Sequence, residues 1–218
     1  FANAPHDVRL ATLAFALGSY RFGRYRKNET PGVRLVPPDG IDIADVARMA
    51  EAAALARDLI NTPSNDMGPE ELAQAAQALA ARFGASFNCI VGDELVSRNF
   101  PLIHAVGMAS TRAPRLIDLS WGDPSHPKVT LVGKGVCFDI GGLDLKPSSG
   151  MLIMKKDMGG AANVLALAQM VMDAKLKIRL RVLIPAVENA VAGNAFRPLD
   201  IFKSRKGLNV EIGNTDAE

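Results

Sequence analysis

Helical segments that alternate with short apolar runs constrain the fold of this chain more than any other feature of the sequence. Apolar residues recur at helical spacing in four segments, which predicts helices over 9–17, 43–59, 69–83 and 159–174. Short apolar runs bounded by turn residues predict strands over 86–91, 104–107, 115–120, 129–132, 178–185 and 210–213. This order is typical of an α/β protein, with a layered αβα fold and a largely parallel or mixed central sheet.

Three residues mark the predicted helix ends. Asp42 precedes the second helix as its N-cap, because its carboxylate can accept hydrogen bonds from unpaired backbone N–H groups. Pro69 suits the first position of the third helix, and Gly84 suits its end. A stretch rich in glycine and proline, residues 23–40, is the predicted linker between the first helix and the second.

Composition excludes several classes of protein. The chain has 218 residues and a net charge of +2, which is too small to favour binding to nucleic acid or to a membrane surface. The basic segment 21–34 has aromatic residues among its charges, a pattern that also suits a nucleic-acid contact, but the small net charge favours a solvated face or an inter-domain contact. Cys89 and Cys137 are far apart and lack metal-type spacing, which favours reduced thiols in a cytoplasmic protein. No apolar run reaches the ~18 residues of a membrane span, and the start has no signal-peptide layout.

Charged residues fall where the predicted strands and one helix meet their loops. Lys134 and Asp139 follow a strand, Asp157 precedes a helix, and Asp216 and Glu218 follow the last strand. Ligands bind at such strand ends in open α/β sheets. Each acid alone could be a helix cap or a surface charge, but four acids together would repel one another without a cation among them. The sequence therefore predicts a site for divalent cations.

Four motifs in this region resemble the leucyl aminopeptidases, a family of two-metal cytosol aminopeptidases. They are Gly133-Lys134-Gly135-Val136-Cys137-Phe138-Asp139, Lys146-Pro147, Asp157-Met158-Gly159-Gly160-Ala161-Ala162 and Asn214-Thr215-Asp216-Ala217-Glu218. The resemblance runs from about residue 44 to residue 218. It implies an enzyme that hydrolyses the N-terminal residue, leucine or another that is often apolar, from peptides.

The resemblance also implies a set of metal ligands around two divalent ions, Mn²⁺ or Zn²⁺: Lys134, Asp139, Asp157, Asp216 and Glu218. Asp139 and Glu218 would serve both ions, and Asp216 the more loosely held one. Lys134 and Asp157 would bind the tighter ion, which also receives the amino group of the substrate. Lysine ligates only as the neutral amine, so the ions must lower its pKa.

The implied mechanism uses a hydroxide that bridges the two metals. Lys146 is expected to be the catalytic residue that polarises the scissile carbonyl, and Met154 is expected to line the pocket for the first side chain. An arginine two positions beyond Glu218 would hold a bicarbonate that moves the proton. The family further implies a homohexamer. Residues 1–36 are expected to be the tail of an N-terminal α/β domain with its linker, and 37–218 the N-terminal part of the catalytic metallopeptidase domain.

Two other functions are weighed against this one. The chain could be a non-catalytic oligomeric scaffold or a DNA-binding regulator that retains the aminopeptidase fold, but the full set of charged site residues argues against a degenerate site. A nucleotide-binding Rossmann domain is excluded, because no Gly-x-Gly-x-x-Gly turn follows the first strand.

A few positions near the predicted site have other roles or depart from the family pattern. Asp144 is expected to orient the loop that carries Lys146, and Glu188-Asn189 to support the site from behind. Ile140 replaces a small hydroxyl residue, and Leu199 stands where a Pro-Gly-Asp turn of the family has glycine.

Overall fold

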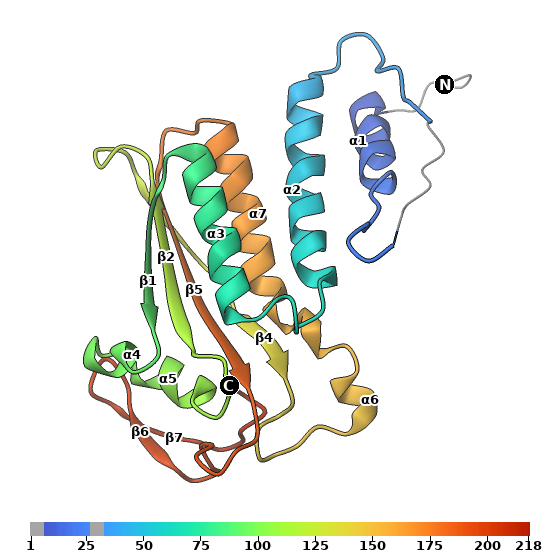
Figure 1. Ribbon diagram of the computed structural model, residues 1–218. Coiled ribbons are helices and arrows are strands. Elements are labelled where there is room, and N and C mark those ends of the chain that lie inside the picture. The colour runs from blue at the N-terminus through green and yellow to red at the C-terminus, as the bar shows by residue number, and fades with distance from the viewer. Residues whose placement is uncertain (1–6, 27–32) are drawn as a thin grey trace.

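The computed structural model describes residues 7–26 and 33–218, and Figure 1 shows a twisted sheet with helices packed against it. The helices are α1 Val8–Gly18, α2 Ile43–Asn61, α3 Pro69–Phe83, α4 Glu94–Ser97, α5 Pro101–Gly107, α6 Ser148–Met151, η1 Met154–Met158 (a 3₁₀ helix) and α7 Gly159–Asp173. The strands are β1 Ser86–Val91, β2 Arg115–Trp121, β3 Lys128–Val132, β4 Gly135–Asp139, β5 Arg179–Asn189, β6 Ile201–Lys203 and β7 Asn209–Glu211.

The central sheet is mixed, with β5 in its middle. β5 pairs antiparallel with β2, which pairs antiparallel with β1, and it pairs parallel with both β3 and β4. Because Val132 pairs with Leu183 and Gly135 with Ala186, β3 and β4 keep one register along β5. They form a single line of strand that is interrupted at residues 133–134.

Helices cover both faces of this sheet. Ile117 and Leu119 of β2 are buried in the larger core cluster beneath α3 and α7, whereas Leu116 belongs to a second cluster beneath α4 and α5. Alternate residues of a strand face opposite sides of a sheet, so the two clusters lie on opposite faces. The predicted αβα layering is therefore confirmed. Further out, α2 packs on α7 and α1 packs on α2 (Figure 1).

The predicted helix ends are confirmed. The Asp42 carboxylate accepts a hydrogen bond from Asp45 N at 3.1 Å, and α2 begins directly after Asp42. Pro69 is the first residue of α3, and Gly84 ends that helix with φ +65°, the left-handed conformation that glycine adopts without steric cost.

Three strand predictions need correction. Residues 104–107 lie in α5, because Pro101 begins a helix there and the four-residue apolar run is too short to distinguish the two structures. The strand predicted at 129–132 resumes as β4, so Asp139 is the last residue of a strand and Lys134 lies in its interruption. The strand predicted at 210–213 is β7, which pairs only with β6 in a separate sheet.

The basic segment between α1 and α2 is attached to its neighbours through its aromatic residues. Tyr20 donates its hydroxyl proton to Asp58 at 2.7 Å, and Tyr25 donates to Asp66. The guanidinium of Arg24 lies 5.8 Å from the centre of the Tyr25 ring. These contacts hold the described part of the segment against α2 and the loop that follows it. Lys27 and residues 28–32 lie outside the described residues, and the inter-domain contact stays a prediction. No helix in the described part of the chain has the length and apolar character to cross a membrane.

Candidate metal centre

The interruption between β3 and β4 places the backbone of Lys134 against the N-terminal end of α7. Ala161 N donates to Lys134 O at 2.8 Å, so the backbone of the interruption is bonded to the helix. A Cβ at Gly133 would lie 2.7 Å from Gly160 O, and a Cβ at Gly160 would lie 2.9 Å from Lys134 N. Glycine at both positions therefore allows the backbones to approach closely.

Asp139 lies at the end of β4 with its carboxylate buried, 2% exposed. Its Oδ1 accepts hydrogen bonds from Gly141 N and from Asn189 Nδ2, both at 2.9 Å. Its Oδ2 lies 3.0 Å from Lys146 Nζ. Since β4 and β5 are parallel, Asn189 at the end of β5 is a direct neighbour at this edge of the sheet.

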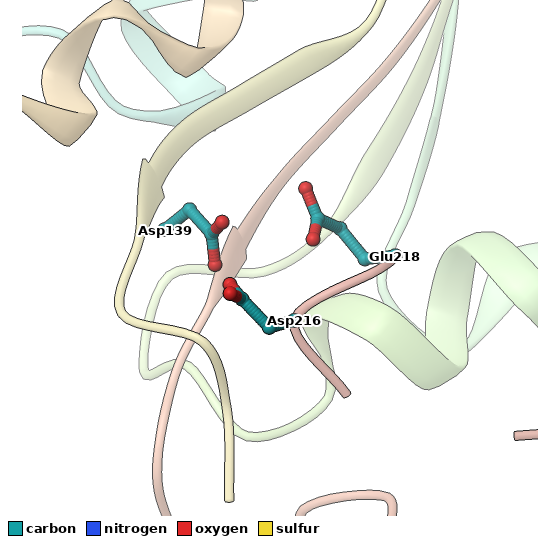
Figure 2. A group of neighbouring side chains, drawn as sticks. All are labelled: Asp139, Asp216 and Glu218. Carbon is teal, nitrogen blue, oxygen red and sulfur yellow. The ribbon is translucent and has the colours of Figure 1, made fainter. Parts of the chain in front are cut away.

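Asp139 at the end of β4 and the two acids of the C-terminal segment, Asp216 and Glu218, point toward one another, as Figure 2 shows. Each offers one carboxylate oxygen, and these oxygens lie within 4.8 Å of one another. Asp216 and Glu218 follow β7, so they reach the edge of the central sheet through a loop. They follow the last strand, as predicted, but that strand pairs with β6 outside the central sheet, and the loop brings the acids together.

Two lysines lie among the acids. Lys146 contacts Asp139 and Asp216, and Lys134 contacts Glu218 and also Asp157 Oδ2, the latter at 3.0 Å. Ion pairing with Asp216, and then with Asp139, raises the pKa of Lys146 against the lowering effect of burial. Burial also lowers the pKa of Lys134, but its two carboxylate partners outweigh burial and raise it. Burial raises the pKa of Glu218 despite the nearby Lys134.

The acidic oxygens are only partly satisfied. Asp157 Oδ2 and both oxygens of Glu218 are buried and accept no hydrogen bond from the described part of the chain. Two of these oxygens contact the Lys134 ammonium, and among the described residues Glu218 Oε2 has no donor. Four carboxylates against two ammonium groups leave an excess of negative charge. Oxygen ligands in such a cluster fit divalent cations such as Mn²⁺ or Mg²⁺.

The remaining predicted site residues lie on η1, directly before α7. Met154 is its first residue and is partly buried, and Asp157 lies within it, two residues before α7 begins. Lys155 Nζ donates to Asn61 O at 2.7 Å and so attaches η1 to the end of α2. The structure thus gathers the charged residues at one sheet edge, with Met154 on the adjoining 3₁₀ helix.

Two supporting residues behave as the sequence suggested, and one does not. Asp144 Oδ2 accepts from Thr215 N at 2.7 Å, so Asp144 does hold its loop. Asn189 contacts Asp139, as described above. Glu188, in contrast, contacts Arg112 at 3.3 Å and Ser110 at 2.7 Å, neither of which belongs to the acid cluster.

Sequence inspection missed Thr215 and Arg112. Arg112 donates to Glu71 at 2.6 Å and to the carbonyl of Ser64, so it connects α3 and the loop before it to the end of β5. Its partners are distant along the chain, and no spacing in the sequence indicates them. Thr215 lies inside a quoted motif, yet its contacts depend on the loop that Asp144 carries.

The fold and this cluster define a class of protein, an αβα domain with a carboxylate- and lysine-rich centre of the kind that holds divalent cations. A family model described as "Cytosol aminopeptidase family, catalytic domain" matches residues 54–218. The chain belongs to the cytosol aminopeptidase family.

Individual relatives agree with this assignment. A probable cytosol aminopeptidase of Roseiflexus castenholzii is 39% identical over 99% of the chain and 48% of its own length. The crystal structure of cytosol aminopeptidase from Coxiella burnetii has a TM-score of 0.91 and 53% identity over 95% of this chain and 45% of that one. The bottromycin maturation enzyme BotP in complex with Mn has a TM-score of 0.86 and 36% identity, over 96% and 46% of the two chains. The chain spans about half the length of the curated relatives it matches.

Proposed function

We propose that this chain forms part of a metal-dependent aminopeptidase, which hydrolyses the N-terminal residue from peptides. The observation that supports this most directly is the convergence of carboxylate oxygens from Asp139, Asp216 and Glu218 within 4.8 Å of one another, beside two lysines and the Asp157 carboxylate. Membership of the cytosol aminopeptidase family supplies the reaction class.

In the proposed site, five side chains hold two divalent cations: Lys134, Asp139, Asp157, Asp216 and Glu218. When bound, such cations act as Lewis acids and lower the pKa of a water molecule so that it can attack a carbonyl. Lys134 would then have to release its proton, because an ammonium group has no lone pair. Asp157 lies beside Lys134, so the substrate's amino group is proposed to bind at this end of the cluster.

Lys146 is proposed to act on the scissile carbonyl. Its ammonium lies at the other end of the cluster, between Asp139 and Asp216, whose carboxylates raise its pKa. A fixed positive charge stabilises the oxyanion that develops on the carbonyl oxygen. Met154 on η1 is proposed to contact the first side chain, and an apolar residue suits that contact.

Several finer points belong to the same proposal. The Mn complex of BotP favours Mn²⁺ as one usable metal, with Zn²⁺ as the alternative. A bicarbonate is proposed to move the proton during hydrolysis. The names of the relatives favour a cytosolic location, and a homohexamer is the proposed assembly. Residues 1–36 are proposed to belong with an N-terminal domain and 37–218 with the catalytic domain.

Calorimetric titration of the chain with Mn²⁺, together with hydrolysis of a leucyl amide, tests the proposal. Asp216→Asn is expected to weaken Mn²⁺ binding at least about tenfold, because a ligand charge is lost. Asp200→Asn is the matched control, since Asp200 pairs with Arg197 at 3.0 Å in an exposed turn. Absence of Mn²⁺ binding by the wild-type chain, or hydrolysis that persists in excess EDTA, contradicts the proposal.

A further inference from the structure

Thr215 directly precedes Asp216 and is fully buried. Its hydrogen bonds connect the segment of Asp216 and Glu218 to the loop that carries Lys146. Its Oγ1 donates to Gly141 O at 2.7 Å and accepts from Asp144 N at 2.8 Å. Its backbone N donates to Asp144 Oδ2 at 2.7 Å. The hydroxyl therefore uses both its donor and one acceptor position, and the two residues are bonded to each other in both directions.

These bonds join two segments that both carry proposed site residues. Gly141 and Asp144 lie in the loop between Asp139 and Lys146, and Thr215 directly precedes Asp216. Glycine at position 142 allows the close approach, because φ there is +63° and a Cβ would lie 3.0 Å from Thr215 Oγ1. The contact thus depends on a backbone conformation that other residues rarely adopt.

Asn189 adds a second connection to the same segment. Its Nδ2 donates to Asp139 Oδ1 and to Thr215 O, each at 2.9 Å. Both partners are acceptors, which fixes the amide with its nitrogen toward them. One buried side chain at the end of β5 therefore sets the distance between Asp139 and the segment of Asp216 and Glu218.

Within the described residues, no strand pairing of the central sheet reaches this segment. Residues 214–218 follow β7, which pairs with β6 and not with the central sheet. Mutual repulsion of the carboxylates would move Asp216 and Glu218 away from Asp139. The ion pairs of Lys146 and Lys134 offset part of that repulsion. The hydrogen bonds of Thr215 and Asn189 hold the segment without using a proposed ligand.

We propose that Asp144 and Thr215 form a positioning clamp, which holds the Lys146 loop against the Asp216–Glu218 segment and thereby preorganises the cation site. This inference rests on the proposed function and adds two residues that touch neither cation nor substrate. Groups behind metal ligands typically change metal affinity 10–100-fold when removed.

Calorimetric Mn²⁺ titration of the chain and four variants tests the clamp. Thr215→Val keeps the shape but removes the hydroxyl, and its Mn²⁺ dissociation constant is expected to rise about 10–100-fold. Thr215→Ser restores the hydroxyl and is expected to bind within about threefold of wild type. Asp144→Ala, on a partly exposed loop, is expected to weaken binding about tenfold. Thr130→Val, on the exposed β3, is the control and is expected to bind as wild type.

The double variant Asp144→Ala/Thr215→Val decides between a clamp and two independent effects. Members of one clamp are expected to be non-additive, so the double variant should bind about as weakly as Thr215→Val alone. Circular dichroism and urea unfolding of the metal-free variants show whether each is folded; if Thr215→Val does not fold, Asp144→Ala and Thr215→Ser carry the test.

Three results overturn the clamp: folded Asp144→Ala with wild-type Mn²⁺ affinity, Thr215→Ser as weak as Thr215→Val, or additive losses in the double variant. All three presuppose that the wild-type chain binds Mn²⁺. If the wild-type chain does not bind, the proposed function fails instead, so the two failures are distinguishable.

Discussion

At the scale of single residues, Leu199 has a backbone conformation that is costly for any residue except glycine. Its φ is +68° and its side chain is 72% exposed, so no packing compensates for the strain. A left-handed conformation costs a residue with a Cβ about 1–2 kcal/mol. This is the position at which the resemblance to the leucyl aminopeptidases predicts glycine.

Leu199→Gly is therefore expected to stabilise the chain. Glycine removes the left-handed cost but adds about 0.5–1 kcal/mol of unfolded-state entropy, so the net gain in the free energy of unfolding is about 0.5–1 kcal/mol. Urea unfolding at equilibrium measures it. Leu199→Ala is the control, because it removes the exposed side chain and keeps the Cβ; a gain from alanine equal to that from glycine would refute the strain argument.

The site residues differ in how well the sequence alone predicts them. The sequence predicts the proximity of Lys134, Asp139 and Asp157. Each residue lies beside the end of a strand or helix, and these ends meet at one edge of the sheet. The role of Thr215 could not be predicted, since its hydroxyl bonds to Gly141 and Asp144 arise only when two distant loops meet. Motif spacing identifies ligand-type residues but not the groups that hold them.

At the scale of elements, the interrupted strand is the feature that connects fold and site. β3 and β4 share one register along β5, and the interruption turns the backbone of Lys134 toward α7. Gly159 and Gly160 begin α7, and neither has a positive φ. A Cβ at Gly160 would meet the backbone of Lys134 in the interruption, whereas a Cβ at Gly159 would not. Their different surroundings allow a matched pair of substitutions.

Gly160→Ala is expected to weaken Mn²⁺ binding, whereas Gly159→Ala is not. A Cβ at Gly160 would lie 2.9 Å from Lys134 N, so the backbone of Lys134 must move. A Cβ at Gly159 would lie 3.8 Å from Ile60 Cδ1, an ordinary contact. We expect at least about a tenfold rise in the dissociation constant for Gly160→Ala, as for other residues that orient ligands. Equal affinities in the two variants, measured by calorimetry, would show that the close approach is not needed.

The element predictions failed where local signals were weak. Residues 104–107 offered only four apolar positions, which fit a strand as well as the helix α5 that Pro101 begins. β4 was missed because Gly133 and Gly135 indicate a loop, although the strand continues after them. The antiparallel pairing of β1 with β2 also lacks a local signal, because the two strands are separated by α4 and α5.

At the scale of the whole molecule, one ionic network joins segments that the sheet ladder does not. Arg112, just before β2, contacts Glu71 of α3, Glu188 of β5 and the carbonyl of Ser64 after α2. A Cβ at Gly68 would lie 2.2 Å from the Arg112 guanidinium, so the arginine lies directly against the chain that begins α3. The network therefore fixes the helical layer to the sheet edge that carries the acids.

Arg112→Met keeps most of the aliphatic volume but removes every one of these contacts. Glu188 is 17% exposed and Glu71 34%, so both would lose a charged partner in partly desolvated surroundings. Hydrogen bonds to charged groups are worth about 1.5–3 kcal/mol, and we expect the free energy of unfolding to fall by about 2 kcal/mol.

Arg98→Met is the matched control. Arg98 pairs with Glu94 four residues earlier, with side chains 61% and 45% exposed, and such pairs contribute less than about 0.5 kcal/mol. Urea unfolding of both variants is the measurement, and a loss for Arg112→Met no larger than that for Arg98→Met would mean that the layers are held together by apolar packing alone.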